Sequence, residues 1–528
     1  MGSFHRSRSA GWMFAGVNTC LPSGAGQGYG IVMRFLALLS LLAGLSVTAA
    51  VSEPPELPQE FRGMWVASVG NIDWPTRPGL PVATQQAQLR GMLDMAKRLN
   101  LNVVILQVRP SCDALYASPY EPWSEYLSGR MGQAPLPKWD PLQFACEEAH
   151  ARGLELHAWA NPFRARYHQA VSPVSADHVT RRHPEWVIPY GRFYWLDPGN
   201  SDARDWSLKV LTDIVRRYDI DGLHLDDYFY PYPETLDGVG LPFVDDVTYD
   251  RYRRNGGRLI REDWRRDNIN GFVQRLYTAI HAEKPWVKFG LSPFGIWRPG
   301  FPAGIKGLDA YTILSADSRQ WLNAGWCDYM APQLYWPTSR REQSFQGLLH
   351  WWGEQNTSGR LLVPGIASAS VGKDRQSGDV INQVQLSRKD GGAKGVVFWN
   401  ASSLRDNLGG VANLLAGGVF DQPALVPETP WLRAAEPPTP ELTGTLKPNQ
   451  GFLSLKWKVG TNDPVSVLVL QTRYGTQWQQ GILPAQAGYR EFDRRRGLAI
   501  PDEVRLVPVG RTGGRGTAAV WPAPAGTP

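Results

Sequence analysis

Short apolar runs alternate with amphipathic segments along most of this chain of 528 residues, and this alternation limits the possible folds more than any other feature. In segments such as residues 84–100 and 205–219, apolar residues recur at the spacing of one helical face. About eight run-plus-helix units occupy roughly 350 residues, which is the pattern of a (β/α)8 barrel with insertions. An open, doubly wound sheet is the alternative, but no G-x-G-x-x-G turn follows the first run. We therefore predict an α/β fold built as a TIM barrel.

The composition changes near residue 420, and this change predicts a division into domains. Residues 61–420 carry the barrel pattern, and residues 51–60 form a short linker before it. Residues 421–441 are Pro-rich, which is typical of a semi-rigid linker. In residues 442–528, strand-like runs are separated by Gly, Asn and Asp, which predicts a small all-β sandwich similar to fibronectin type III domains.

The first 50 residues have the features of a leader that ends in a secretory signal peptide. A basic residue precedes the apolar stretch 35–47, and the small residues Thr48 and Ala50 follow it. The stretch is shorter than the roughly 20 apolar residues that span a membrane, so cleavage after Ala50 is favoured over an uncleaved anchor. Residues 1–32 fit either an extended leader or untranslated sequence before a start at Met33. We expect export across the inner membrane to the periplasm or cell envelope, without stable membrane insertion after cleavage.

Charge and cysteine content narrow the classes of partner and fold. The formal net charge is +6, from 55 Lys and Arg against 49 Asp and Glu, and the basic residues are spread along the chain. Such a diffuse charge does not indicate nucleic-acid binding, and it is compatible with attraction to an acidic polymer such as cell-wall material. Cys20 lies in the leader, so the mature chain keeps Cys112, Cys146 and Cys327. This odd, sparse set argues against a disulfide framework or a cysteine-ligated zinc site.

Polar residues end several apolar runs, and the active sites of barrels lie where the strands end. In the run DGLHLDD, alternation along a strand places Leu223 and Leu225 on one face, with His224 and Asp226 on the other. The leucines should face the helices, so His224 and Asp226 should point into the barrel. Asp227 begins on the helix-facing side and reaches the pocket only if the strand ends or bulges before it.

Paired carboxyl groups in an aromatic pocket are what glycoside hydrolysis requires. One carboxylate attacks the sugar or activates water, and a second carboxyl group protonates the leaving oxygen. We expect Asp226 to be the nucleophile or base. The acid stays open among Asp227, Asp317 and Asp113, although Asp317 could instead stabilise the first turn of a helix.

Residues at the ends of the other runs are candidates to hold the sugar. Sugar faces stack on aromatic rings, and several of the 22 Trp lie near run ends, among them Trp65 and Trp399. Arg109 could pair with a lactyl carboxylate, whereas His157 and His224 could equally be core histidines with satisfied hydrogen bonds. The predicted substrate-binding residues are Arg109, Asp113, His157, Trp159, Asn161, Arg164, His224, Tyr228, Trp297, Gln333, Tyr335 and Trp336.

Seven motifs in order resemble the glycosyl hydrolase-like 10 family of bacterial secreted proteins. They are FRGMWVAS, QVRPSCDALY, DPLQFACEEAHARGLELHAWANPFR, WLDPG, IDGLHLDDYFYP, FGLSPFGIWR and DYMAPQLYW, within residues 61–416. The resemblance implies a (β/α)8 barrel and glycosidase activity in the cell envelope, since the family includes a division-associated glycosidase of peptidoglycan strands stripped of their peptides. It supports Asp226 as the leading catalytic carboxylate. The run FGLSPFGIWR ends without the Glu that many related barrel glycosidases use as acid, and the lipid-anchor cysteine of some relatives is missing.

We therefore predict a secreted glycoside hydrolase that acts on an amino-sugar glycan, with peptide-free peptidoglycan strands as the favoured substrate and no cofactor. One alternative is a metal-dependent polysaccharide deacetylase with His157, His224 and Asp226 as ligands. The other is a cell-wall glycan-binding protein that has lost catalysis. A glycan is the expected partner in each case.

Overall fold

Eight parallel strands form the centre of the larger domain in the computed structural model, which describes residues 53–460, 465–486 and 488–522. The leader and signal peptide predicted for residues 1–50 lie outside the described residues. Each strand pairs in parallel with the next. In chain order the strands are β1 (Phe61–Val66), β2 (Val103–Arg109), β3 (Glu155–Ala160), β7 (Gly222–Leu225), β10 (Lys288–Leu291), β11 (Tyr329–Met330), the halves β12 (Leu361–Leu362) and β13 (Gly365–Ile366), and β14 (Gly395–Phe398).

The sheet closes into a barrel because β12 and β13 together act as one strand. β12 pairs with β11, β13 pairs with β14, and β14 pairs with β1. Pro364, between the two halves, has no N–H to donate, which interrupts the ladder, but its carbonyl oxygen still accepts from Val397 N at 3.1 Å. The predicted (β/α)8 barrel is therefore confirmed. Its C-terminal strand ends gather at one face, where barrel active sites lie.

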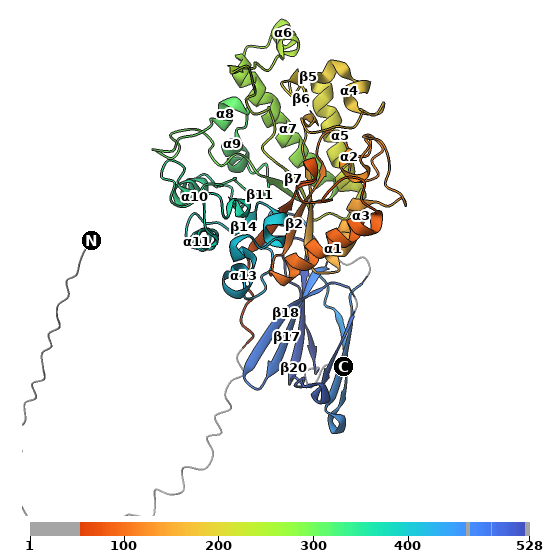
Figure 1. The fold of residues 1–528 in the computed structure, drawn as a ribbon. Helices are drawn as coiled ribbons and strands as arrows, with labels where there is room; N and C mark the ends of the chain where they lie inside the picture. The colour runs from red at the N-terminus through yellow and green to blue at the C-terminus, as the bar shows by residue number, and fades with distance from the viewer. Residues whose placement is uncertain (1–52, 461–464, 487, 523–528) are drawn as a thin grey trace, which may run out of the picture. The chain divides into compact units, whose positions relative to one another are not determined.

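Helices follow the strands and surround the barrel (Figure 1). Side-chain caps start several of them: Asp140 accepts from Leu142 N at 3.1 Å, and Asn200 accepts from Asp202 N at 2.9 Å. None of the described helices is long and apolar enough to cross a lipid bilayer. The helices are α1 (Val82–Arg98), α2 (Glu125–Ser128), α3 (Pro141–His150), α4 (Val179–Arg182), α5 (Ser201–Arg217), α6 (Asp246–Arg254), α7 (Arg261–Glu283), α8 (Ala310–Ile313), α9 (Ser318–Asn323), α10 (Phe345–Glu354), α11 (Ser377–Lys389), α12 (Ala401–Arg405) and α13 (Val411–Leu414). Short strands in the connections are β4 (Arg164–Arg166), β5 (Val187–Tyr190), β6 (Phe193–Leu196), β8 (Thr235–Leu236) and β9 (Val239–Gly240).

The barrel wall separates two buried clusters of side chains. Leu223 and Leu225 belong to the outer cluster, between the strands and the helices. His157 and His224 lie inside the barrel, fully buried, and the Nδ1 atom of each is 2.9 Å from the hydroxyl of Tyr329. The faces of β7 are thus those that the alternation of its residues predicts.

The C-terminal region forms two antiparallel sheets with a core between them. Leu453, Leu455 and Trp457 from one sheet pack with Leu468 and Leu506 from the other. The predicted all-β sandwich is therefore present, while its similarity to fibronectin type III domains stays a prediction. One sheet contains β15 (Glu441–Lys447), β16 (Phe452–Lys458) and β19 (Gly488–Asp493), and the other contains β17 (Val465–Tyr474), β18 (Gln477–Pro484), β20 (Glu503–Gly510) and β21 (Ala519–Trp521).

The Pro-rich segment between the domains packs against the barrel. Leu425 N donates to Pro58 O at 2.9 Å, and Leu425 O accepts from Glu60 N at 2.9 Å. Trp431 Nε1 donates to the buried carboxylate of Asp328, directly before β11, at 2.8 Å. The segment therefore lies at the N-terminal ends of the strands, opposite the face where the active site is expected.

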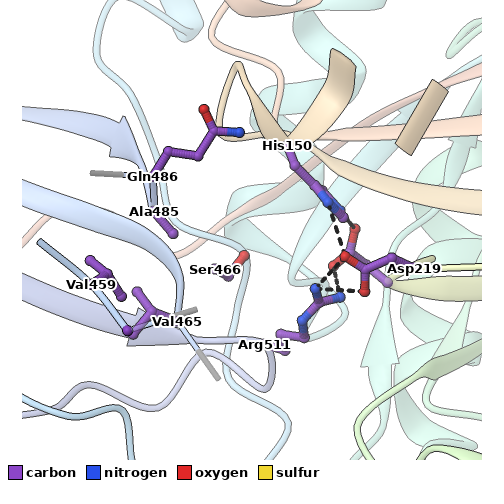
Figure 2. A pocket seen from close by; sticks show the side chains of 10 residues that line it. His150, Asp219, Val459, Val465, Ser466, Ala485, Gln486 and Arg511 are labelled. Carbon is purple, nitrogen blue, oxygen red and sulfur yellow. Dashed lines mark hydrogen bonds and ion pairs between the residues drawn. The ribbon is translucent and has the colours of Figure 1, made fainter. Parts of the chain in front are cut away.

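Charged residues of the small domain and the barrel form a network at the same end. Arg511 donates to Asp219 at 2.8 Å and to Asp221 at 3.2 Å, and His150 Nε2 is 2.8 Å from Asp221 (Figure 2). Burial lowers the pKa of His150, but the charges of Asp221 and Asp219 outweigh it and raise that pKa above its usual value. Lys288 Nζ adds a bond to Arg511 O at 2.8 Å. A cavity of about 420 Å³ borders this network, but its carboxylates are already paired with cations.

Replacing Arg511 tests this contact. Arg511→Ala leaves Asp221, whose side chain is only 3% exposed, with His150 and a backbone N–H as partners. We expect the free energy of unfolding, measured with urea, to fall by about 2 kcal/mol. The control Arg495→Ala removes an ion pair with Asp493 whose arginine is 71% exposed, and it should leave the urea midpoint of unfolding nearly unchanged. Equal effects of the two substitutions would contradict the assignment.

Candidate active site

A cavity of about 210 Å³ opens where the strands of the barrel end. The residues that line it end or follow β1, β3, β7, β10, β11 and β14, so they come from around most of the barrel. Among the described residues that line the cavity, the acidic ones are Asp226 and Asp227. The lining consists of Trp65, Trp159, Asp226, Asp227, Tyr228, Tyr232, Ser292, Phe294, Gln333, Tyr335 and Trp399.

Asp226 is held by an amide that the neighbouring strand provides. Ala160 and Leu225 are register partners at the ends of β3 and β7, so the next residues, Asn161 and Asp226, come out side by side. Asn161 Nδ2 lies 3.1 Å from Asp226 Oδ1 and 3.2 Å from Oδ2. Arg164 N donates to Asn161 Oδ1 at 2.8 Å, which turns the NH2 group of the amide toward the carboxylate.

Two further donors and one cation act on the same carboxylate. Trp159 Nε1 donates to Asp226 Oδ2 at 3.2 Å, and Tyr228 N donates to Oδ1 at 3.3 Å. The pKa of Asp226 is raised above its ordinary value by burial. The charge of Arg164 and the hydrogen bonds from Tyr228, Asn161 and Trp159 act in the opposite direction but are weaker. These contacts limit the rise in the pKa of Asp226 but do not cancel it.

Asp227 reaches the cavity because β7 ends at Leu225, two residues before it. The hydroxyl of Tyr232 donates to the Asp227 carboxylate. Burial and the negative charge of Asp226 raise the pKa of Asp227 to about 7, although the bond from Tyr232 acts in the opposite direction. Two buried neighbouring carboxyl groups share one negative charge more easily than two. The site therefore combines two neighbouring carboxyl groups whose pKa values are both raised, with that of Asp227 close to neutral pH.

Aromatic rings form the walls around this pair. Trp399 lies 6.1 Å from Trp159, 6.3 Å from Trp65 and 6.4 Å from Tyr335, measured between ring centroids. The guanidinium group of Arg164 lies 4.8 Å from the centroid of the Tyr228 ring, which also lines the cavity. Such walls suit the apolar faces of a sugar, while the carboxyl groups face its reacting atoms.

The structure brings together half of the predicted binding residues. Trp159, Tyr228, Gln333 and Tyr335 line the cavity, and Asn161 and Arg164 lie directly behind it. Gln333 Nε2 donates to Ser292 O at 2.9 Å, which orients its side chain at the rim. Their contact with substrate stays a prediction.

Asp317, Trp297, Asp113 and Trp336 lie outside the lining of the cavity. Asp317 caps α9 and accepts from Trp297 Nε1 at 3.1 Å, so these two residues belong to a separate surface depression after β10. Asp113 is buried in the loop after β2, where it accepts from Ser111 N at 2.9 Å. Trp336 packs its ring at 88° against Phe294, behind the wall.

Arg109 lies outside the lining of the cavity and is paired inside the protein, which disfavours its predicted contact with a substrate carboxylate. The side chain is fully buried and forms two hydrogen bonds to Glu121, at 2.8 and 2.6 Å. Its Nη1 atom donates to Asn161 O at 2.5 Å and to Pro162 O at 3.1 Å. Arg109 therefore fixes the backbone that carries Asn161 instead of binding a ligand.

His157 and His224 are also internal, so the predicted roles in substrate or metal binding do not fit. His157 Nε2 lies 3.1 Å from Glu155, and His224 Nε2 lies 2.9 Å from Ser292 Oγ. Both rings contact Tyr329 through their other nitrogen atom. Over the described part of the chain, no group of three His, Cys, Asp or Glu side chains is arranged to hold a metal ion.

Five lining residues are absent from the predicted set. Trp65 and Trp399 end β1 and follow β14, the first and last strands, and the same strand-end argument could have selected them. Tyr232, Ser292 and Phe294 lie in the connections after β7 and β10, where no periodic pattern shows which way a side chain points.

Comparison with known proteins identifies the family of this chain. A family model described as Glycosyl hydrolase-like 10 matches residues 60–380. The chain belongs to the glycosyl hydrolase-like 10 family. It is 38% identical over 439 residues to glycosyl hydrolase YngK of Bacillus subtilis (strain 168). The aligned part covers 80% of this chain and 84% of the relative. It is 35% identical over 350 residues to glycosyl hydrolase DigH of Escherichia coli (strain K12), covering 61% of this chain and 77% of the relative.

A solved structure is similar at a lower sequence identity. The glycoside hydrolase domain of PgaB (BpsB) from Bordetella bronchiseptica shares 14% identity at a TM-score of 0.42, over 68% of this chain and 98% of that one. The family match and the two sequence relatives confirm the predicted family and the predicted class of enzyme, a glycoside hydrolase of the glycosyl hydrolase-like 10 family.

A double-mutant cycle tests the structural role of Arg109. Arg109→Met or Glu121→Met leaves one buried charge without its partner, and each should lower the free energy of unfolding by about 3–5 kcal/mol. The double substitution removes both charges and should cost clearly less than the sum of the two. Urea unfolding followed by tryptophan fluorescence measures each variant. Additive losses would show that the two residues act independently.

Proposed function

We propose that this member of the glycosyl hydrolase-like 10 family is a secreted glycosidase that cleaves an amino-sugar glycan, with peptide-free peptidoglycan strands as its substrate. The observation that carries the proposal is the pair Asp226 and Asp227, two buried carboxyl groups that line one aromatic cavity. The motif resemblance supports the choice of substrate. The signal-like stretch near the N-terminus supports export to the cell envelope.

The chemistry follows from the environments of the two carboxyl groups. Asp227, whose pKa is raised to about 7, is the acid and gives its proton to the oxygen of the leaving sugar. Asp226, oriented by Asn161 and Trp159, acts in its ionised form and stabilises the positive charge that develops at the anomeric carbon. The aromatic walls hold the sugar so that its reacting bond meets both groups.

The competing functions fit the site less well. A metal-dependent deacetylase needs ligands that converge, whereas His157 and His224 are bonded to Tyr329 inside the barrel and Asp226 is bonded to Asn161. Activity that is insensitive to a chelator would agree with this reading. A glycan-binding protein without catalysis has no need of two neighbouring buried carboxyl groups with raised pKa values.

Mass spectrometry of the products from denuded and intact peptidoglycan tests the proposal. We expect cleavage of denuded strands, and we expect Asp226→Asn and Asp227→Asn each to lower the rate at least 100-fold or so. Asp317→Asn is the matched control, because Asp317 caps α9 outside the cavity. Its rate should stay close to that of the unmodified enzyme. Release of acetate with intact chains, or binding without any cleavage, would overturn the proposal.

The pH dependence of activity reports the proton on Asp227. The acid form is the active one, so kcat/KM should fall above a pKa of about 7, by about tenfold per pH unit. Tyr232→Phe removes a hydrogen bond that favours ionised Asp227, so the pKa rises and the alkaline limb should move to higher pH. Tyr194→Phe, on an exposed residue of β6, is the control and should leave the profile unchanged. A shift to lower pH in Tyr232→Phe would contradict the assignment of the acid.

A further inference from the structure

The two carboxyl groups of the cavity belong to consecutive residues, and this limits how they can work together. Both follow the end of one strand, β7, instead of coming from two facing strands. In the usual two-carboxylate mechanisms the acid and its partner act on opposite sides of the sugar, with carboxyl groups ~5–9.5 Å apart. Within the described chain, the cavity lining adds no acidic residue from another strand. No carboxyl group from another strand is therefore available in the described lining to attack the anomeric carbon from the far side, which leaves this role open to a group of the substrate itself.

The surroundings of Asp226 suit a carboxylate that accepts a hydrogen bond from the substrate, more than one that attacks the anomeric carbon. The amide of Asn161 bridges both oxygens of the carboxylate, and Trp159 Nε1 and Tyr228 N bind one oxygen each. The carboxylate is thus oriented and its charge is spread over both oxygens. All these contacts are 3.1–3.3 Å long. Two of them come from the single Nδ2 atom of Asn161. The carboxylate retains the capacity to accept one more N–H.

An aromatic box lies beside the same carboxylate. Trp159, which donates to Asp226, forms one wall with Trp399 at 6.1 Å, and Tyr335 lies 6.4 Å from both Trp399 and Trp65. Trp65 Nε1 is turned away from the cavity toward His224, at 3.1 Å, so its ring presents carbon atoms to the box. A box of this kind suits a small planar group that carries a methyl, and the adjacent carboxylate suits the N–H of that group.

We propose that the substrate itself supplies the nucleophile, through the carbonyl oxygen of a 2-acetamido group held between Asp226 and the aromatic box. This inference rests on the proposed glycosidase function and specifies which sugars the site accepts. The sugar at the scissile bond must carry an N-acetyl group at C2, trans to the leaving oxygen.

The reaction has two balanced steps. In the first, the acetamido oxygen forms a bond to C1, the bond from C1 to the leaving oxygen breaks, and Asp227 transfers its proton to that oxygen. Asp226 accepts the hydrogen bond of the acetamido N–H and balances the positive charge on the ring that forms. In the second, a water molecule gives a proton to Asp227 as its oxygen bonds to C1, and the bond from C1 to the acetamido oxygen breaks. The acetamide is restored, and Asp227 is again protonated.

Chemical removal and restoration of the N-acetyl groups tests the proposal on one polymer. Denuded glycan strands, the same strands after N-deacetylation, and these strands after re-acetylation are compared as substrates. We expect kcat to fall at least 100-fold on deacetylation, because an intramolecular nucleophile is lost, and to recover on re-acetylation. Equal cleavage of the native and deacetylated strands would overturn the inference but leave the glycosidase function intact. Failure to cleave any of the three would overturn the proposed function itself.

Two variants and the product stereochemistry separate the roles of the carboxyl groups. An aryl glycoside of N-acetylglucosamine has a leaving group that needs no proton. Asp227→Asn should therefore release the aryl alcohol in the first, single-turnover step at a rate within tenfold of the unmodified enzyme, although the second step still needs Asp227 as base. Asp226→Asn should lose at least 100-fold in that first step on the aryl glycoside and in the cleavage of denuded strands. NMR of the first product should show retained configuration at C1. Inversion, or a sugar covalently bound to Asp226 in a mass spectrum, would overturn the inference.

Discussion

The hydrogen bonds from Asn161 to Asp226 join the ends of two neighbouring strands, and the rest of the active site depends on them. They exist because Ala160 and Leu225 are register partners, which brings the next residue of each strand to the same place. Arg164 N fixes the direction of the amide, and Arg109 fixes the backbone of Asn161 from behind. Burial and the negative charge of Asp226 beside it both make a second charge unfavourable, which raises the pKa of Asp227.

The interior of the barrel supports this arrangement by being filled with large polar rings. A Cβ atom at Gly222 would lie 2.6 Å from the ring of His157, and one at Gly290 would lie 1.9 Å from the ring of Tyr329. These two glycines therefore make room for a layer in which His157 and His224 both bond to the hydroxyl of one tyrosine. The layer holds Ser292 and Trp65 at the floor of the cavity through His224, so the histidines contribute to the site by positioning its lining.

The sequence allowed the barrel and the faces of its strands to be predicted, because the alternation of Leu223, His224 and Leu225 is a local property of a strand. It could not show that β7 ends at Leu225, since the end of so short a strand is set by its neighbours. Arg109 does point inward, but its partner Glu121 comes from the connection after β2, and no periodic signal places that residue. Asp317 and Trp297 lie on another such connection, and they bond to each other away from the cavity.

The same geometry accounts for the missing glutamate at the end of the fifth barrel strand. At that position the chain has Ser292 and Phe294, which line the cavity as floor and wall and carry no acidic group. A carboxyl group there is needed only when the enzyme supplies both the acid and its partner from different strands. If the substrate supplies the nucleophile, one strand end suffices, because Asp226 and Asp227 then act on adjacent groups of one sugar. A nucleophile supplied by the substrate would therefore explain both the consecutive pair at the end of β7 and the lack of an acidic residue after β10 in the described lining.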